Sequence, residues 1–177
     1  KDKNSAIDHF LSSEDITLDQ ELFLYDIEAS IAHTHELEKI NIFTKTEARK
    51  VISSLKKLGK LFQTNKFKLT AKYEDCHSAI EDFLTKELGS IGKKIHTGRS
   101  RNDQIIVAMR LYAREKLDEI YSINLKVAKA FLEKSEKHSS NPMPGYTHLQ
   151  RAMPSSWGLW FGAFAESFLD NAELLSN

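Results

Sequence analysis

The chain has 177 residues, and its 25 Lys and Arg side chains balance 25 Asp and Glu side chains, so the formal net charge is zero. This neutrality argues against a protein whose main task is binding nucleic acid or an anionic membrane surface. Hydrophobic residues make up 41% and charged residues 28%, which predicts a globular protein with a real core. The single cysteine, Cys76, excludes an internal disulfide and suits a reducing compartment.

No apolar run approaches the roughly 20 residues of a membrane span, and no signal peptide opens the chain, so we expect a soluble, cytoplasmic protein. The first residue is Lys1, and residues 172–177 still fit a helical pattern. A domain seldom ends inside such a pattern without a cap, and we therefore expect a fragment of a longer protein.

Long helices are predicted, because only seven Gly and three Pro punctuate the sequence. The first predicted helix covers residues 18–37, where apolar residues recur near helical spacing. The second begins at a capping box formed by Thr44 and Glu47. The third covers about 73–88, and Gly89 stands at its expected C-cap.

The second half of the sequence also favours helices. Residues 89–102 contain three Gly and several small polar residues, so we predict a loop there. A long helix follows over about 103–137, and a last helix starts after Pro154. Only residues 67–69 resemble a strand. The predicted fold class is all-α, with a domain boundary in the 89–102 loop.

Residues 93–104, KKIHTGRSRNDQ, hold four cations, a histidine, two hydroxyls and an asparagine ahead of the long helix. Arginine presents a planar fork of donors that matches carboxylate or phosphate. Amides at a helix N-terminus also favour an anion. Two interpretations remain open here: a site for a small anionic ligand, or a solvated basic loop capped by Asn102 or Asp103.

Residues 143–154, MPGYTHLQRAMP, form a second cluster. Gly145 permits an unusual backbone turn, and a proline on either side stiffens the segment. This scaffold would hold Thr147 and His148 in a fixed orientation. A histidine near its ordinary pKa is the usual proton-transfer group, although a histidine hydrogen-bonded at a loop–helix junction is the commoner case.

The third cluster is Glu74-Asp75-Cys76-His77, with Glu81 one helical turn after His77. A cysteine beside a histidine invites a metal interpretation. One cysteine and scattered histidines nevertheless lack the repeated ligand spacing of a zinc site, so we predict no metal.

These clusters together resemble argininosuccinate lyase, a family within the aspartase/fumarase superfamily of helical lyases. The resemblance rests on four ordered blocks, at residues 22–33, 74–77, 92–104 and 143–154. The Thr-His-Leu-Gln stretch is shared loosely across the superfamily, whereas the HTGRSRNDQ string points to this one family. The alternatives are a sister lyase acting on adenylosuccinate, aspartate or fumarate, a non-catalytic structural protein like the lens crystallin members, and a helical scaffold with a chance resemblance.

The resemblance implies a reversible β-elimination of argininosuccinate to arginine and fumarate, the last step of arginine biosynthesis, without a cofactor or metal. It implies that Arg101 and Asn102 bind the substrate carboxylates, that Thr147 contacts the fumarate portion, and that His148 belongs to the acid/base pair. The remaining implied residues are two substrate contacts near the N-terminus, Ser13 and Asp19, and three supporting residues, His77, Ser100 and Gln150.

The resemblance also implies a small N-terminal helical domain over residues 1–97, followed by the first long helices of a central lyase-type bundle over 98–177. Full members are homotetramers whose bundle builds each active site from three subunits. Their mobile Gly-Ser-Ser-x-Met-Pro-x-Lys loop, which carries the catalytic serine, is missing from this sequence. We therefore expect that the chain alone cannot turn over substrate, and that it exposes apolar surface around Trp157, Trp160 and Phe164.

Overall fold

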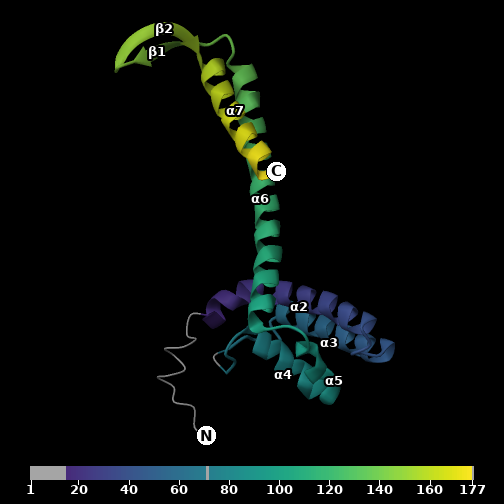
Figure 1. Cartoon of the computed structure of the whole chain (residues 1–177). Helices are drawn as coiled ribbons and strands as arrows, with labels where there is room; N and C mark the ends of the chain where they lie inside the picture. Colours follow the sequence, from purple (N-terminus) through teal and green to yellow (C-terminus); the bar gives the residue numbers. More distant parts are fainter. Residues whose placement is uncertain (1–14, 71, 177) are drawn as a thin grey trace. The chain divides into compact units, whose positions relative to one another are not determined.

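The computed structural model describes residues 15–70 and 72–176 and is mostly helical, which confirms the predicted class (Figure 1). The chain divides into two compact units, Lys1–Tyr112 and Ala113–Asn177, and each is described by itself. The division between residues 97 and 98 that the resemblance implies stays a prediction. Among the described residues, no helix is long and apolar enough to cross a membrane.

The first unit is built from short and medium helices. Its elements in chain order are α2 (Asp15–Lys39), α3 (Lys45–Gln63), α4 (Cys76–Leu88), α5 (Ser90–Lys93), the 3-10 helix η1 (Lys94–His96) and the start of α6 (Arg101–Lys137). The predicted helices are therefore confirmed with small shifts at their ends, and Gly89 caps α4 with a φ of 60°. Residues 67–69 form no strand.

The prediction of an unbroken loop over residues 89–102 is wrong, because α5 and η1 occupy its first half. Gly92 misled it. A Cβ atom on Gly92 would lie only 2.3 Å from the carbonyl oxygen of Leu84, so this glycine lets α5 pack closely on α4. It does not mark a flexible turn.

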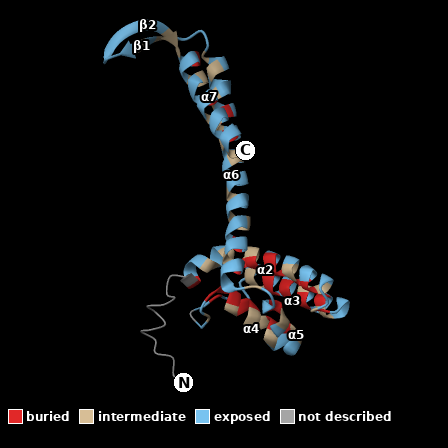
Figure 2. Ribbon diagram, in the orientation of Figure 1, coloured by how far each residue is buried: buried red, intermediate tan, exposed pale blue. Residues whose placement is uncertain are grey.

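The core of the first unit lies between α2, α3 and α4, where Figure 2 shows most of the buried residues. Large side chains from each element are fully buried; they include Phe23, Val51, Leu55, Ile80, Leu84 and Ile95. Because Ile95 belongs to η1, the core also fixes the start of the segment that leads to α6.

The predicted capping box at the start of α3 is confirmed and has a second task. Glu47 Oε2 accepts a hydrogen bond from the Thr44 amide at 2.8 Å, and the Thr44 hydroxyl accepts one from the Glu47 amide at 3.2 Å. The other carboxylate oxygen of Glu47 accepts from Lys94 Nζ at 2.8 Å. The hydrogen bond from Lys94, with those from Thr44, lowers the pKa of Glu47 to about 2. One carboxylate thus caps α3 and ties it to η1.

We expect Glu47→Gln to flatten the loss of stability in acid. A carboxyl whose pKa is lower in the folded state stabilises the fold above its ordinary value of 4.5, and this contribution is lost as the pH falls through about 2. Glutamine keeps the capping box but cannot titrate. Urea unfolding at pH values from 4.5 down to 2 should therefore show a shallower slope for the variant, while Glu28→Gln, on an exposed residue of α2, should match the wild type. Equal slopes for all three proteins would contradict this role of Glu47.

The second unit contains the rest of α6, the strands β1 (Pro142–Thr147) and β2 (Gln150–Ser156), and α7 (Trp157–Ser176). The two strands form an antiparallel hairpin that the sequence did not predict. Most residues of both strands are exposed on both faces, so the alternation of apolar and polar residues that identifies a half-buried strand is missing.

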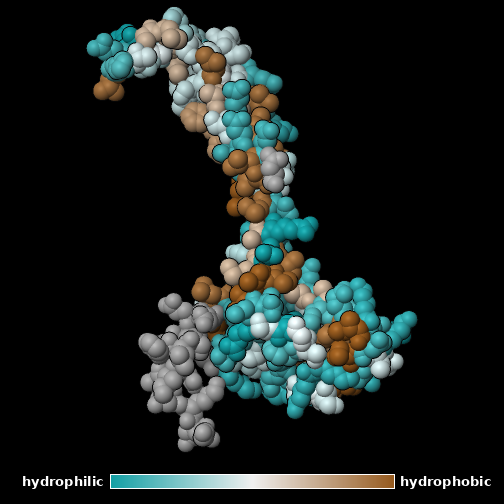
Figure 3. All heavy atoms as spheres, in the orientation of Figure 1, coloured by the Kyte–Doolittle hydropathy of each residue, from teal (hydrophilic) through white to brown (hydrophobic). Residues whose placement is uncertain are grey.

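Aromatic rings join α6 to α7 within the second unit. The Phe131 ring stacks on Phe164 and Phe168, with centroid distances of 5.3 and 5.8 Å. Trp157 and Trp160 are each 43% exposed and Phe164 is 39% exposed, as predicted. Figure 3 shows apolar atoms along these two helices. Apolar exposure on this scale is typical of an interaction surface.

Candidate functional site

The site residues predicted from the sequence fall into two groups. Five belong to the first unit: Asp19, His77, Ser100, Arg101 and Asn102. Three belong to the hairpin of the second unit: Thr147, His148 and Gln150. Ser13 lies outside the described residues.

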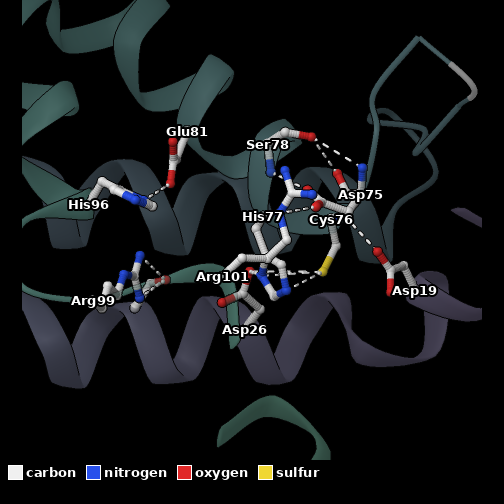
Figure 4. A network of polar contacts seen from close by, with 11 residues as sticks. Asp19, Asp26, Asp75, Cys76, His77, Ser78, Glu81, His96, Arg99 and Arg101 are labelled. Carbon is white, nitrogen blue, oxygen red and sulfur yellow. Dashed lines mark hydrogen bonds and ion pairs between the residues drawn. The ribbon is translucent and has the colours of Figure 1, made fainter. Parts of the chain in front are cut away.

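In the first group, the starting turn of α4 is the centre of a polar network (Figure 4). Asp75 is the N-cap, and its Oδ1 accepts the Ser78 amide hydrogen bond at 2.7 Å. The Ser78 hydroxyl in turn accepts from the Asp75 amide at 3.2 Å, which completes a capping box. The next amide, that of Cys76, donates to Asp19 Oδ2 of α2 at 2.8 Å. Burial nevertheless raises the pKa of Asp19, against this hydrogen bond.

A buried ion pair lies directly below this turn. His77 Nδ1 and Asp26 Oδ2 are 2.6 Å apart, and the two residues are only 3% and 0% exposed. Burial alone would lower the pKa of His77, but the hydrogen bond to Asp26 and its charge outweigh burial, so the pKa lies above its ordinary 6.5. The pair's contribution to stability is therefore complete below about pH 6.5 and is lost as the pH rises through the folded-state pKa.

Sequence reasoning did not select Asp26 as a site residue. Its burial could not be read from the chain, because Asp26 looks like one more acidic residue in an acidic helix. The available signal was its position between Phe23 and Ile27, which places a carboxylate on the apolar face of α2. Buried charges need a partner, and His77 supplies it.

Cys76 completes the cluster. Its Sγ lies 3.9 Å from Asp26 Oδ2 and 3.7 Å from His77 Nδ1, so these three side chains are close enough to share a metal ion. Burial, with the charges of Asp26, Asp19 and Asp75, raises the pKa of the thiol far above its ordinary value. A cysteine binds a metal ion as the thiolate. Because the thiolate of Cys76 is disfavoured, this cluster favours hydrogen bonding over metal binding. The absence of a metal stays a prediction.

We expect native Cys76 to resist thiol reagents. Its side chain is fully buried and its thiolate is disfavoured, so reaction with dithionitrobenzoate at neutral pH should be at least about a hundredfold slower than after unfolding in guanidinium. Ser140→Cys, at an exposed position, provides the internal control and should react at once with a single equivalent. Rapid reaction of the wild-type chain would show that the cluster opens or is not formed.

The start of α6 carries the predicted anion-binding residues. Ser100 precedes the helix, and its amide and hydroxyl donate to Asp103 Oδ2 at 2.7 and 2.9 Å. The Asp103 amide donates to Ser100 Oγ at 3.4 Å, so Ser100 is the N-cap and Asp103 is its partner in a capping box. Asn102 is exposed in the first turn of the helix.

Arg101 is held by two carboxylates from the start of α4. Its Nη1 donates to Glu74 Oε1 at 2.8 Å, and its Nε forms an ion pair with Asp75 Oδ2 at 2.8 Å. The hydrogen bond to Glu74 raises the pKa of Arg101 further. The side chain remains 48% exposed, so a fixed guanidinium at the N-terminus of α6 is accessible to solvent. This arrangement can bind a carboxylate.

The segment just before Arg101 is fastened to α2. Both terminal nitrogens of Arg99 donate to Ser30 Oγ at 3.2 Å. His33 Nε2 lies 3.0 Å from the carbonyl oxygen of Thr97. Gly98 between them has a φ of 74°, which glycine adopts without strain. The sequence pattern identified this segment as basic but did not identify its anchors, Ser30 and His33.

In the second group, His148 lies at the tip of the hairpin. Thr147 and Gln150 are paired, so His148 and Leu149 form the two-residue turn, with φ values of 49° and 62°. Both values being positive is the signature of a type I′ turn, which normally contains Asn and Gly. Leu149 is 98% exposed, so its strained backbone is not compensated by packing within the described residues.

Gly145 has a different role from the one predicted. It is not among the described residues with positive φ. A Cβ atom there would instead lie 2.8 Å from the carbonyl oxygen of Met153, so Gly145 allows β1 and β2 to approach where their register shifts. The predicted rigid scaffold for Thr147 and His148 is therefore a bulged hairpin.

We expect Leu149→Asn to stabilise the hairpin by about 1 kcal/mol, because asparagine tolerates positive φ and leucine does not. Amide hydrogen exchange at Thr147 and Gln150 should slow about fivefold. Leu149→Ala is the matched control, since it removes the same exposed side chain but keeps the backbone strain. Equal exchange rates in the two variants would contradict the strained-turn interpretation.

The chain has clear relatives. Residues 5–177 match a protein family described as Lyase. The chain is 47% identical over 169 residues to the argininosuccinate lyase of Xanthomonas euvesicatoria pv. vesicatoria (strain 85-10), a match that covers 96% of this chain and 39% of that protein. It is likewise 47% identical over 169 residues to the argininosuccinate lyase of Stenotrophomonas maltophilia (strain R551-3), again with 96% and 39% covered. The chain thus spans about 39% of the length of these curated relatives.

Solved structures show the same fold. An EDDS lyase variant with bound fumarate matches with a TM-score of 0.77 and 26% identity, over 90% of this chain and 31% of that one. The fumarate lyase from Mesorhizobium sp. BNC1 matches with a TM-score of 0.74 and 21% identity, over 94% of this chain and 40% of that one.

Proposed function

Since the chain belongs to the lyase family, we propose that the protein it comes from is an argininosuccinate lyase, which splits argininosuccinate reversibly into arginine and fumarate. The observation that carries the proposal is the 47% identity to argininosuccinate lyases over 96% of the chain. The HTGRSRNDQ string of residues 96–104 supports this family over a sister lyase. We place the reaction in the cytoplasm.

The chemistry sets requirements that the first unit can meet in part. A base removes a proton from the carbon beside a carboxylate, and the resulting dianion needs cations or amides fixed around it. Arg101, held by Glu74 and Asp75, would bind one substrate carboxylate, and Asn102 would bind with it in the first turn of α6. Because the guanidinium is already fixed, it loses little conformational entropy on binding.

Asp19 and Ser13 would contact the substrate from the N-terminal side. Asp19 already accepts the Cys76 amide through Oδ2, so one carboxylate oxygen has a structural partner. His77 would support the site through its contact with Asp26, and Ser100 would support it by capping α6.

His148 would belong to the acid/base pair that moves protons during elimination. The departing guanidinium must leave protonated, which requires an acid near the substrate nitrogen. The type I′ turn presents His148 at an exposed tip, with Thr147 beside it to contact the fumarate portion and Gln150 closing the turn in a supporting role. No cofactor or metal enters the proposed reaction.

We also propose that the protein is a homotetramer assembled through α6 and α7. A groove of about 740 Å³ lies along these helices in the second unit, and its walls include Leu125, Leu132, Leu159 and Leu169. Burying such a surface between subunits would supply the apolar contacts that a stable oligomer needs. The partners are therefore the small-molecule substrate and further copies of the protein, with no nucleic acid and no membrane.

The direct test uses the complete reading frame that contains this chain. With argininosuccinate as substrate, the purified enzyme should release fumarate, which is followed by its ultraviolet absorbance. We expect His148→Asn to lower kcat at least about a hundredfold with little change in KM, because a proton-transfer group is lost while substrate contacts remain. His35→Asn, on an exposed histidine of α2, is the control and should behave like the wild type.

Two outcomes would contradict the proposal. A folded wild-type enzyme that releases no fumarate would rule out this reaction and return the choice to a sister lyase or a structural protein. Full turnover in His148→Asn would remove His148 from the chemistry while leaving the reaction itself in place.

A further inference from the structure

We propose that Asp26 is a positioning residue: through its buried pair with His77 it fixes the start of α4, and thereby holds Asp75 where it orients Arg101. The inference rests on the proposed function only for the statement that Arg101 binds the substrate. Its geometry comes from contacts within the first unit (Figure 4).

The first step is the attachment of α4 to α2. Asp26 is fully buried, and its Oδ2 lies 2.6 Å from His77 Nδ1, while its Oδ1 has no partner among the described residues. A second contact, from the Cys76 amide to Asp19 Oδ2 at 2.8 Å, lies one residue away along α4. Asp19 and Asp26 are seven residues apart on α2, two turns along one face. Two contacts this close fix the direction of the first turn of α4 as well as its position.

The second step passes from His77 to Asp75 along this turn. Asp75 divides its two carboxylate oxygens between two tasks: Oδ1 accepts the Ser78 amide and caps the helix, and Oδ2 faces Arg101. Because capping fixes the carboxylate to the backbone of α4, any displacement of the helix start displaces Oδ2 with it. The position of His77 therefore determines where the Asp75 carboxylate lies relative to Arg101.

The third step is the choice between the two partners of Arg101. The Glu74 side chain is 60% exposed, whereas that of Asp75 is only 11% exposed. An exposed ion pair contributes little and can rearrange in solvent, whereas a sheltered carboxylate acts more strongly and from a fixed place. Asp75 Oδ2 makes no hydrogen bond, so it acts on Arg101 Nε as a sheltered charge at 2.8 Å, and in this way it fixes where the guanidinium lies.

A pair that only stabilised the fold would affect activity through the amount of folded enzyme. The positioning role makes a different demand: loss of the Asp26 contact must raise KM through Arg101 and leave kcat per folded enzyme nearly unchanged. The effects of changing Asp26 and Arg101 must also fail to add, because both act on the same contact with the substrate.

The experiment measures KM and kcat for argininosuccinate in the complete enzyme. Arg101→Lys should raise KM about tenfold, as expected for the loss of roughly one charge-assisted hydrogen bond. Asp26→Leu, which keeps the branching at Cγ but removes the acceptor, should raise KM about fivefold alone and less than about twofold in the Arg101→Lys background. Asp26→Asn retains an oxygen for His77 and should return KM to within about twofold of the wild type.

A second variant keeps the test decisive if Asp26→Leu does not fold. Asp75→Asn preserves the cap of α4 but replaces the charge that faces Arg101, so it should raise KM about fivefold and not add to Arg101→Lys. Asp82→Asn is the matched control, because Asp82 also lies on α4 but pairs with Lys86 instead; it should leave KM unchanged.

An unchanged KM in Asp75→Asn, or an Asp26→Leu effect that adds fully to Arg101→Lys, would overturn this inference while an active wild type upheld the proposed function. A wild-type enzyme that releases no fumarate would overturn both.

Discussion

The Asp26–His77 pair is the interaction on which the first unit depends. It buries an acidic and a basic side chain in the core, where desolvation is costly and an apolar pair would often be more stable. The pair instead specifies how α4 packs on α2. A hydrogen bond of 2.6 Å fixes one register of the two helices, whereas apolar contacts tolerate several registers. Cys76, Asp75 and Arg101 all take their places from that register.

The side chains proposed for the chemistry lie at the ends of regular elements. Arg101 and Asn102 begin α6, Asp75 caps the start of α4, and His148 lies at the tip of a tight hairpin. Ends of this kind combine rigidity with free backbone donors, which suits the binding of carboxylates. One of these ends has a strained backbone, because His148 and Leu149 both have a positive φ, which most side chains avoid.

Patterns among residues close in sequence predicted the helices well, but they did not predict contacts between residues far apart in sequence. The Thr44–Glu47 capping box involves residues three apart, so the sequence contains all of it. The hairpin was missed because its strands bury neither face, and Gly92 was misread because its tight contact lies with Leu84 in another helix. The importance of Asp26 was hidden for the same reason: its partner is 51 residues away, and burial arises only when α2 meets α4. Arg101, Thr147 and His148 are predicted as site residues through the family resemblance, which carries long-range information that periodicity lacks, and their roles stay predictions.

The most direct test of this account is the protonation state of His77, read from the ring nitrogen shifts of the ¹⁵N-labelled chain during a pH titration. The account predicts that both ring nitrogens remain protonated above pH 6.5, because the pKa of His77 is raised by the Asp26 carboxylate. It also predicts that Asp26→Asn returns the imidazole to its neutral form at lower pH. A His77 ring that is already neutral below pH 6.5 in the wild-type chain would contradict the buried ion pair between α2 and α4.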